Sequence, residues 1–181
     1  LDSTLNDNDG TNLGAVYGTI GKISKALDFE CDDPDRVTFP HSSSLDLESE
    51  VTIELWFKPE SFNYDKATLC TKHTSYYTNI LTTGQVAIYT FWNDGGSRGP
   101  SNWMVANTPI TIDNWHHIVW SESNNGLRKI FINGLLDVQG NYEASIWSTS
   151  SKTFLGHNDW NENERRTDGV LDEVRISNIA R

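Results

Sequence analysis

Two stretches of the chain, residues 92–103 and 157–166, combine indole rings with amide, carboxylate and guanidinium side chains. Sugar rings stack their C–H faces on indoles, while planar polar groups of these kinds bond the sugar hydroxyls. The two stretches are therefore candidate sugar-binding loops. The candidate ligand-binding residues in them are Trp92, Arg98, Asn102, Trp103, Asp159, Trp160 and Arg165. The alternative for Trp103 and Trp160 is packing within the core or within a loop.

A second candidate site is a carboxylate in a strand-like segment, Gly169 to Ser177. Strict alternation along this segment predicts that Asp172 shares the inward face with Val170 and Val174. A buried, unpaired carboxylate costs several kcal/mol unless a cation or several donors satisfy it. Calcium prefers oxygen ligands, and the polar stretch of residues 2–9, with three Asp and two Asn, would supply more of them. The alternative is that Asp172 only accepts backbone hydrogen bonds and that this stretch is solvated.

The sequence lacks the patterns expected of an enzyme on a β-sheet fold. Glycoside hydrolysis needs two carboxylates about 5 to 10 Å apart, facing one cleft. Glu54 is the only acid on its strand face, and Asp172 and Glu173 are neighbours that point to opposite sides. For the same reason His116 and His117 cannot chelate one metal ion together. With no nucleophile elbow or phosphate loop either, we predict that the chain is not an enzyme.

Short strands must position these residues, because apolar residues follow strand spacing and not helical spacing. In the clearest segment, Val51 to Lys58, apolar and mostly polar residues alternate. Asn133-Gly134 is a strong two-residue hairpin signal, which predicts a hairpin over Leu127 to Val138. The remaining expected strands are Ala26–Glu30, Arg36–Pro40, Ala67–Lys72, Asn79–Thr82, Gln85–Trp92, Trp103–Asn107, Trp115–Ser121, Thr153–Gly156 and Gly169–Ser177. Many short strands without helices predict an all-β antiparallel sandwich.

Length and charge limit the remaining possibilities. The 181 residues suit a single domain spanning residues 1–181. A formal charge of −11, from 25 acidic and 14 basic residues, leaves no basic footprint for nucleic acid. No apolar run approaches the roughly 18 residues of a spanning helix, so we expect no membrane insertion. Cys31 and Cys70 allow one disulfide, with two buried free thiols as the equal alternative.

Seven segments in a fixed order resemble the laminin-G-like, concanavalin A-like lectin/glucanase superfamily, in particular its type 3 modules. The motifs are DSTLNDNDGT (2–11), GKISKALDFE (21–30), VTFPHSSSLDL (37–47), VTIELWFKP (51–59), NWHHIVWS (114–121), LRKIFINGLL (127–136) and GVLDEVRISNIAR (169–181). Modules of this kind usually begin with another strand before the Asp-Ser segment. We therefore expect that the chain is excised from a larger multidomain protein.

The resemblance implies a jelly-roll β-sandwich of two curved antiparallel sheets with a structural calcium, used for carbohydrate binding or adhesion beside other domains. It maps calcium ligands onto Asp2, Asn6, Asn8 and Asp172. The sequence thus predicts a non-catalytic, lectin-like module of an extracellular or cell-surface protein, with a glycan or polysaccharide as its partner. The alternative is a protein–protein adhesion or spacer domain of the same fold that binds no sugar.

Overall fold

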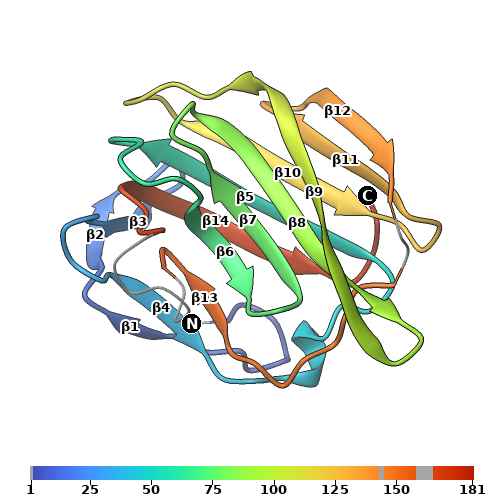
Figure 1. Cartoon of the computed structure of the whole chain (residues 1–181). Helices are drawn as coiled ribbons and strands as arrows, with labels where there is room; N and C mark the ends of the chain where they lie inside the picture. Colours follow the sequence, from blue (N-terminus) through green and yellow to red (C-terminus); the bar gives the residue numbers. More distant parts are fainter. Residues whose placement is uncertain (1, 143–144, 158–164) are drawn as a thin grey trace.

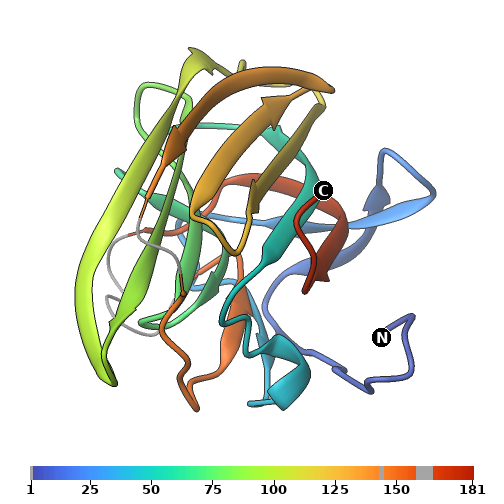
Figure 2. The ribbon, with the colours of Figure 1, turned by 90° about the vertical axis from the view of Figure 1, so that its right-hand side faces the viewer.

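The chain folds into two stacked antiparallel sheets of seven strands each in this computed structural model (Figure 1). The structure describes residues 2–142, 145–157 and 165–181. Sheet A has the order β1-β4-β13-β6-β7-β8-β9, and sheet B has the order β12-β11-β10-β5-β14-β3-β2. Figure 2 shows the sandwich from the side, with β8 and β9 of sheet A on the left. The all-β, jelly-roll prediction is confirmed.

Most of the strands are short, as the spacing of turn residues predicts, but two strands of sheet A are 10 and 13 residues long, and the second extends well beyond the predicted Trp103–Asn107. Sheet A contains β1 (Thr11–Leu13), β4 (Arg36–Phe39), β6 (Ala67–Lys72), β7 (Tyr76–Ile80), β8 (Gln85–Asp94), β9 (Ser97–Pro109) and β13 (Thr153–Leu155). Sheet B contains β2 (Val16–Ile20), β3 (Lys25–Phe29), β5 (Val51–Pro59), β10 (His116–Glu122), β11 (Leu127–Ile132), β12 (Leu135–Asn141) and β14 (Gly169–Ser177). The described helical structure is one 3₁₀ turn, η1 (Ser43–Leu45), and no described helix is long and apolar enough to cross a membrane.

Alternation along the strands builds the core between the sheets. In β5, Val51, Ile53, Leu55 and Phe57 are all buried in the core, whereas the alternating Glu54, Trp56 and Lys58 face outward. The predicted hairpin is also present: β11 pairs with β12 across Asn133-Gly134, and both turn residues have positive φ. This backbone matches the twist of the flanking strands, and asparagine and glycine tolerate it best.

The expected alternation of β14 is wrong. A β-bulge shifts the register between Asp172 and Arg175, and Glu173 takes a φ of 49°. Before the bulge Leu171 enters the core, so Asp172 faces outward beside Trp56. After it, Val174 and Ile176 pack against the core. One extra residue therefore moves Asp172 to the face opposite the predicted one.

A buried ion pair joins the two sheets inside the sandwich. The Arg128 guanidinium on β11 donates to the Glu122 carboxylate on β10, with Nε 2.8 Å from Oε2. The same guanidinium donates across the core to Thr90 on β8 and to the Asn102 carbonyl on β9. Burial raises the pKa of Glu122 against the opposing effect of Arg128. Trp120 adds a second link, donating to Thr78 on β7 at 2.7 Å.

Replacing Glu122 by leucine should lower the free energy of unfolding by about 3–5 kcal/mol, because Arg128 stays buried without its carboxylate. Urea denaturation measures the loss. The exposed Glu48→Gln is the control and should change stability by less than about 0.5 kcal/mol. The double variant Glu122→Leu/Arg128→Met should recover most of the loss, since no buried charge remains. An undiminished loss in the double variant would show that packing, and not charge, dominates here.

Candidate functional site

Three aromatic rings form a row on the outer face of sheet A, the face turned away from sheet B. The antiparallel register sets Tyr77 of β7 opposite Tyr89 of β8, and Tyr89 opposite Trp103 of β9. The neighbouring Tyr76 and Met104 point into the core, so these three side chains point outward. The ring centroids are 4.1 Å apart for Tyr77 and Tyr89 and 4.2 Å apart for Tyr89 and Trp103. Tyr77, Tyr89 and Trp103 are called the aromatic row below.

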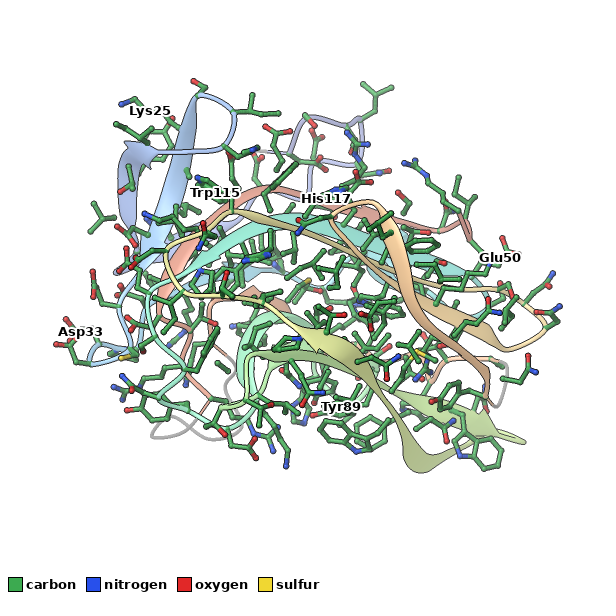
Figure 3. The ribbon with its side chains drawn as sticks, turned by 90° about the horizontal axis from the view of Figure 1, so that it is seen from above. Lys25, Asp33, Glu50, Tyr89, Trp115 and His117 are labelled. Atoms are coloured by element: carbon green, nitrogen blue, oxygen red, sulfur yellow. The ribbon has the colours of Figure 1, made fainter. Side chains whose placement is uncertain are left out.

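The aromatic row is accessible at one end. Trp103 is 37% exposed, whereas Tyr77 and Tyr89 are almost fully buried. Figure 3 looks along the sandwich and places Tyr89 and His117 on opposite sides of the molecule. Burial raises the pKa of both tyrosines, so their hydroxyls stay protonated near neutral pH. The row therefore presents one partly exposed indole, backed by neutral rings.

Two cationic side chains reach the aromatic row. Nη1 of Arg165 donates to the Tyr89 hydroxyl at 3.2 Å, and the Lys66 ammonium lies 5.2 Å from the centre of the Trp103 ring. The backbone joins their segments, because the Thr68 amide donates to the Arg165 carbonyl at 2.9 Å. Lys66 and Arg165 both adopt positive φ, at 64° and 70°. Such backbone geometry is uncommon for long side chains and clusters at functional sites.

A buried amide lies beside the aromatic row. Asn79 follows Tyr77 by two residues on β7, so it shares the outer face, and its cross-strand neighbours are Thr68 and Ala87. Its side chain is fully buried, and neither amide atom has a hydrogen-bond partner among the described residues. An unsatisfied buried polar group of this kind costs about 1–3 kcal/mol. The Asn79 amide thus has unused hydrogen-bonding capacity beside the aromatic row.

Of the predicted sugar ligands, the structure brings together Trp103 and Arg165, one from each candidate loop, and it joins them through Tyr89. Asn102 alternates with Trp103 and so faces inward, and its backbone carbonyl accepts from Arg128. The Trp92 ring lies against Gly99, since a Cβ on that glycine would come within 2.4 Å of it. Asp159, Trp160 and the Arg98 side chain lie outside the described residues.

Sequence reasoning missed Tyr77, Tyr89, Asn79 and Lys66. The expected strand began at Asn79, whereas β7 begins at Tyr76. A strand reaching back to Tyr76, paired through the Thr83-Gly84 turn, would have set Tyr77 opposite Tyr89. The cationic residues carry no comparable signal, because Lys66 lies just before β6 and Arg165 follows a long connection from β13.

The predicted calcium ligands take separate partners. Asp172 accepts from the Ile23 amide at 2.8 Å and from the Glu173 amide at 2.9 Å. Asp2 accepts from the amides of Thr4 and Asn8, which lowers its pKa. The Asn8 amide exchanges hydrogen bonds with the Ser44 hydroxyl of η1, and the Asn6 side chain is exposed. Asp172 thus has the backbone donors of the alternative interpretation, and Asp2 closes a local turn.

Among the described residues, one group of acidic side chains could hold a metal ion. Carboxylate oxygens of Asp28, Glu30 and Glu60 all lie within 4.8 Å of one another. Burial, and then repulsion from Asp28 and Asp168, raises the pKa of Glu30 and of Glu60. The three residues, called the acidic cluster below, come from β3, its end and the end of β5. A cation would relieve their mutual repulsion.

The other candidate ligands are structural. His117 stacks on Trp56 on the outer face of sheet B, with ring centroids 4.8 Å apart. Nε2 of His116 instead accepts a hydrogen bond from the backbone amide of Thr111 at 3.1 Å. The two imidazoles therefore point to opposite sides, as predicted. Both cysteines are free thiols: Cys70 is buried in the core, which raises its pKa to about 12, and Cys31 is half-buried.

Solved structures share this fold. Domain 4 of AbnA, a GH43 extracellular arabinanase from Geobacillus stearothermophilus in complex with arabinotriose, is 24% identical with a TM-score of 0.69, over 96% of this chain and 79% of that domain. The binding domain of Paraclostridial Mosquitocidal Protein 1 is 15% identical, with a TM-score of 0.77, over 99% of this chain and 46% of that one.

The ligand-binding domain of botulinum neurotoxin serotype D, in complex with N-acetylneuraminic acid, is 11% identical with a TM-score of 0.69, over 96% of this chain and 44% of that one. The chain thus spans less than half of either toxin domain, and at these identities the likeness is one of fold. No curated protein matches the chain. The family model described as the concanavalin A-like lectin/glucanases superfamily matches residues 32–181, and the chain therefore belongs to this superfamily.

Proposed function

We propose that the chain is a non-catalytic carbohydrate-binding module of an extracellular protein, and that sugars bind at the aromatic row. The exposed Trp103 ring carries the proposal, because it extends a stack of rings and has the Arg165 guanidinium nearby. An open indole beside planar hydrogen-bonding groups suits a sugar's C–H face and hydroxyls. Domain 4 of AbnA, which this chain matches over 79% of its length, was solved with arabinotriose bound, and this supports the same ligand class.

The second candidate function is adhesion to another protein, the alternative expected from the sequence. Large apolar side chains are exposed on and around the edge strand β2. They are Leu13, Val16, Tyr17, Ile20 and Ile23. Exposed apolar patches of this kind often mark protein interfaces. The aromatic row favours the sugar-binding function, because it combines an apolar ring with polar groups that can orient a ligand.

A glycan array should detect binding to the chain, and Trp103→Ala should lower the affinity about tenfold or more, because the sugar loses its stacking surface. Trp160→Ala tests the other indole predicted from the sequence. Trp56→Ala is the matched control, since Trp56 also stacks on a ring but lies on sheet B. Its affinity should equal that of the parent chain. Absence of saccharide binding across the array would favour the adhesion function.

We also propose that the module binds a structural calcium ion, and the acidic cluster supports this better than the predicted ligands do. Its carboxylates converge and repel one another, whereas Asp2 and Asp172 are already satisfied by backbone amides. Calcium favours carboxylate oxygens, and binding to the folded state alone would stabilise the fold.

Calcium should raise the melting temperature at pH 7, and excess chelator should reverse the gain. Asp28→Asn should abolish the gain if the acidic cluster holds the ion, and Asp172→Asn should abolish it if the predicted ligands do. Differential scanning calorimetry of the two variants, with and without calcium, separates these locations. An unchanged melting curve for the parent chain after complete chelation would contradict a structural ion.

Without divalent cations, Glu60→Gln should melt at a higher temperature than the parent chain at pH 7. The folded pKa of Glu60 is raised above its ordinary value of 4.5, so folding favours the protonated carboxyl. The stability that this group contributes is therefore fully present below pH 4.5 and is lost as the pH rises through the folded pKa. Glutamine mimics the protonated form, so the difference should vanish near pH 4. Thermal scans from pH 4 to 7 measure it. Glu48→Gln, exposed and outside the cluster, should show no such pH-dependent gain.

A further inference from the structure

The two cations at the aromatic row point to the class of sugar that it binds. The chain carries a formal charge of −11, and yet Arg165 and Lys66 both reach this row. We propose that the row binds an anionic saccharide, whose carboxylate or sulfate pairs with Arg165 and Lys66 while its ring stacks on Trp103. This inference rests on the sugar-binding function proposed above and specifies its ligand.

The geometry of Arg165 suits an anion next to a stacked ring. A guanidinium has five N–H donors in a planar fork that matches a carboxylate or sulfate, and the Tyr89 contact uses one of them. The backbone of Arg165 is held at its carbonyl by the Thr68 amide of β6. This bond and the nearby Thr167 hydroxyl, which donates to the Thr68 carbonyl at 2.6 Å, fix the point from which the side chain extends. The cation is thus positioned by the sheet itself.

Lys66 supplies the second charge from an adjacent segment. Its ammonium lies over the Trp103 ring, at the accessible end of the row, and its side chain is 34% exposed. It also pairs with Asp65 at 3.5 Å, but that carboxylate is 61% exposed, and such surface pairs contribute little. A ligand anion can therefore compete for the ammonium at small cost.

Asn79 provides an independent observation that points to a ligand. It lies on β7, next to β6, which Lys66 directly precedes, and two strands away from β9, which carries Trp103. Its buried amide has no partner among the described residues, although it could donate two hydrogen bonds and accept two. An unmet amide beside two cations and an open indole matches a ligand that is both charged and hydroxylated.

The test uses saccharides in charged and uncharged pairs. An array presents uronate, sialylated and sulfated oligosaccharides, each beside its methyl-esterified or desulfated counterpart, to the full chain. We expect the charged member of a pair to bind at least tenfold more tightly, and its affinity to fall as salt rises. Uronate and sialylated sugars carry a carboxylate, and sulfated sugars carry a sulfate. Comparing these groups of ligands shows which anion the site prefers.

Variants locate the effect by isothermal titration with the tightest charged ligand and its neutral partner. Arg165→Gln and Lys66→Gln should each lower the affinity for the charged ligand about tenfold and leave the neutral one nearly unchanged. Lys22→Gln is the matched control, because its ammonium lies 4.5 Å over Trp56 on sheet B, and it should bind as the parent chain does. Asn79→Ala should weaken binding of both ligands without lowering the melting temperature.

The outcomes separate this inference from the function on which it rests. Equal affinity for charged and neutral partners, with loss of both in Trp103→Ala, would overturn the anionic specificity and leave sugar binding in place. Unchanged charge preference in both Arg165→Gln and Lys66→Gln would also overturn it. No saccharide binding in any arm would overturn both proposals.

Discussion

Each central strand of this sandwich must give every second side chain to a shared core, and the rest of the structure depends on that constraint. In β5 the core takes Ile53, Leu55 and Phe57, which leaves the residues between them for the outer surface. The same division in β9 sends Met104 inward and Trp103 outward. Side chains available for binding therefore occur at alternate positions, and they meet only when the registers of neighbouring strands agree.

The parts of the fold that could be predicted from sequence are those encoded within one strand or one turn. The alternation of β5 and the Asn133-Gly134 turn are local, and both were predicted correctly. The bulge in β14 is not local in this sense, because Glu173 carries no residue-type signal for positive φ. As a one-residue change of register reverses every later side chain, a single unrecognised bulge was enough to put Asp172 on the wrong face.

The candidate site was harder to predict than the fold because it is assembled from many parts of the chain. Trp103 and Arg165 are 62 positions apart in sequence, and the link between them is Tyr89, on a third segment. Composition suggested both loops, since indoles and guanidinium groups are typical of sugar sites. It could not rank Trp92 against Trp103, because only the pairing of β8 with β9 sets Trp103 beside Tyr89.

The two cysteines differ in their accessibility to thiol reagents. Cys70 is sealed in the core and its thiol has a pKa of about 12, so it offers almost no thiolate to a reagent. Cys31 is partly open and follows Glu30 directly, although burial and nearby carboxylates raise its pKa as well. A maleimide dye applied at mildly alkaline pH would therefore attach at one position. Its fluorescence would then report on the electric field around the neighbouring carboxylates without any engineered residue.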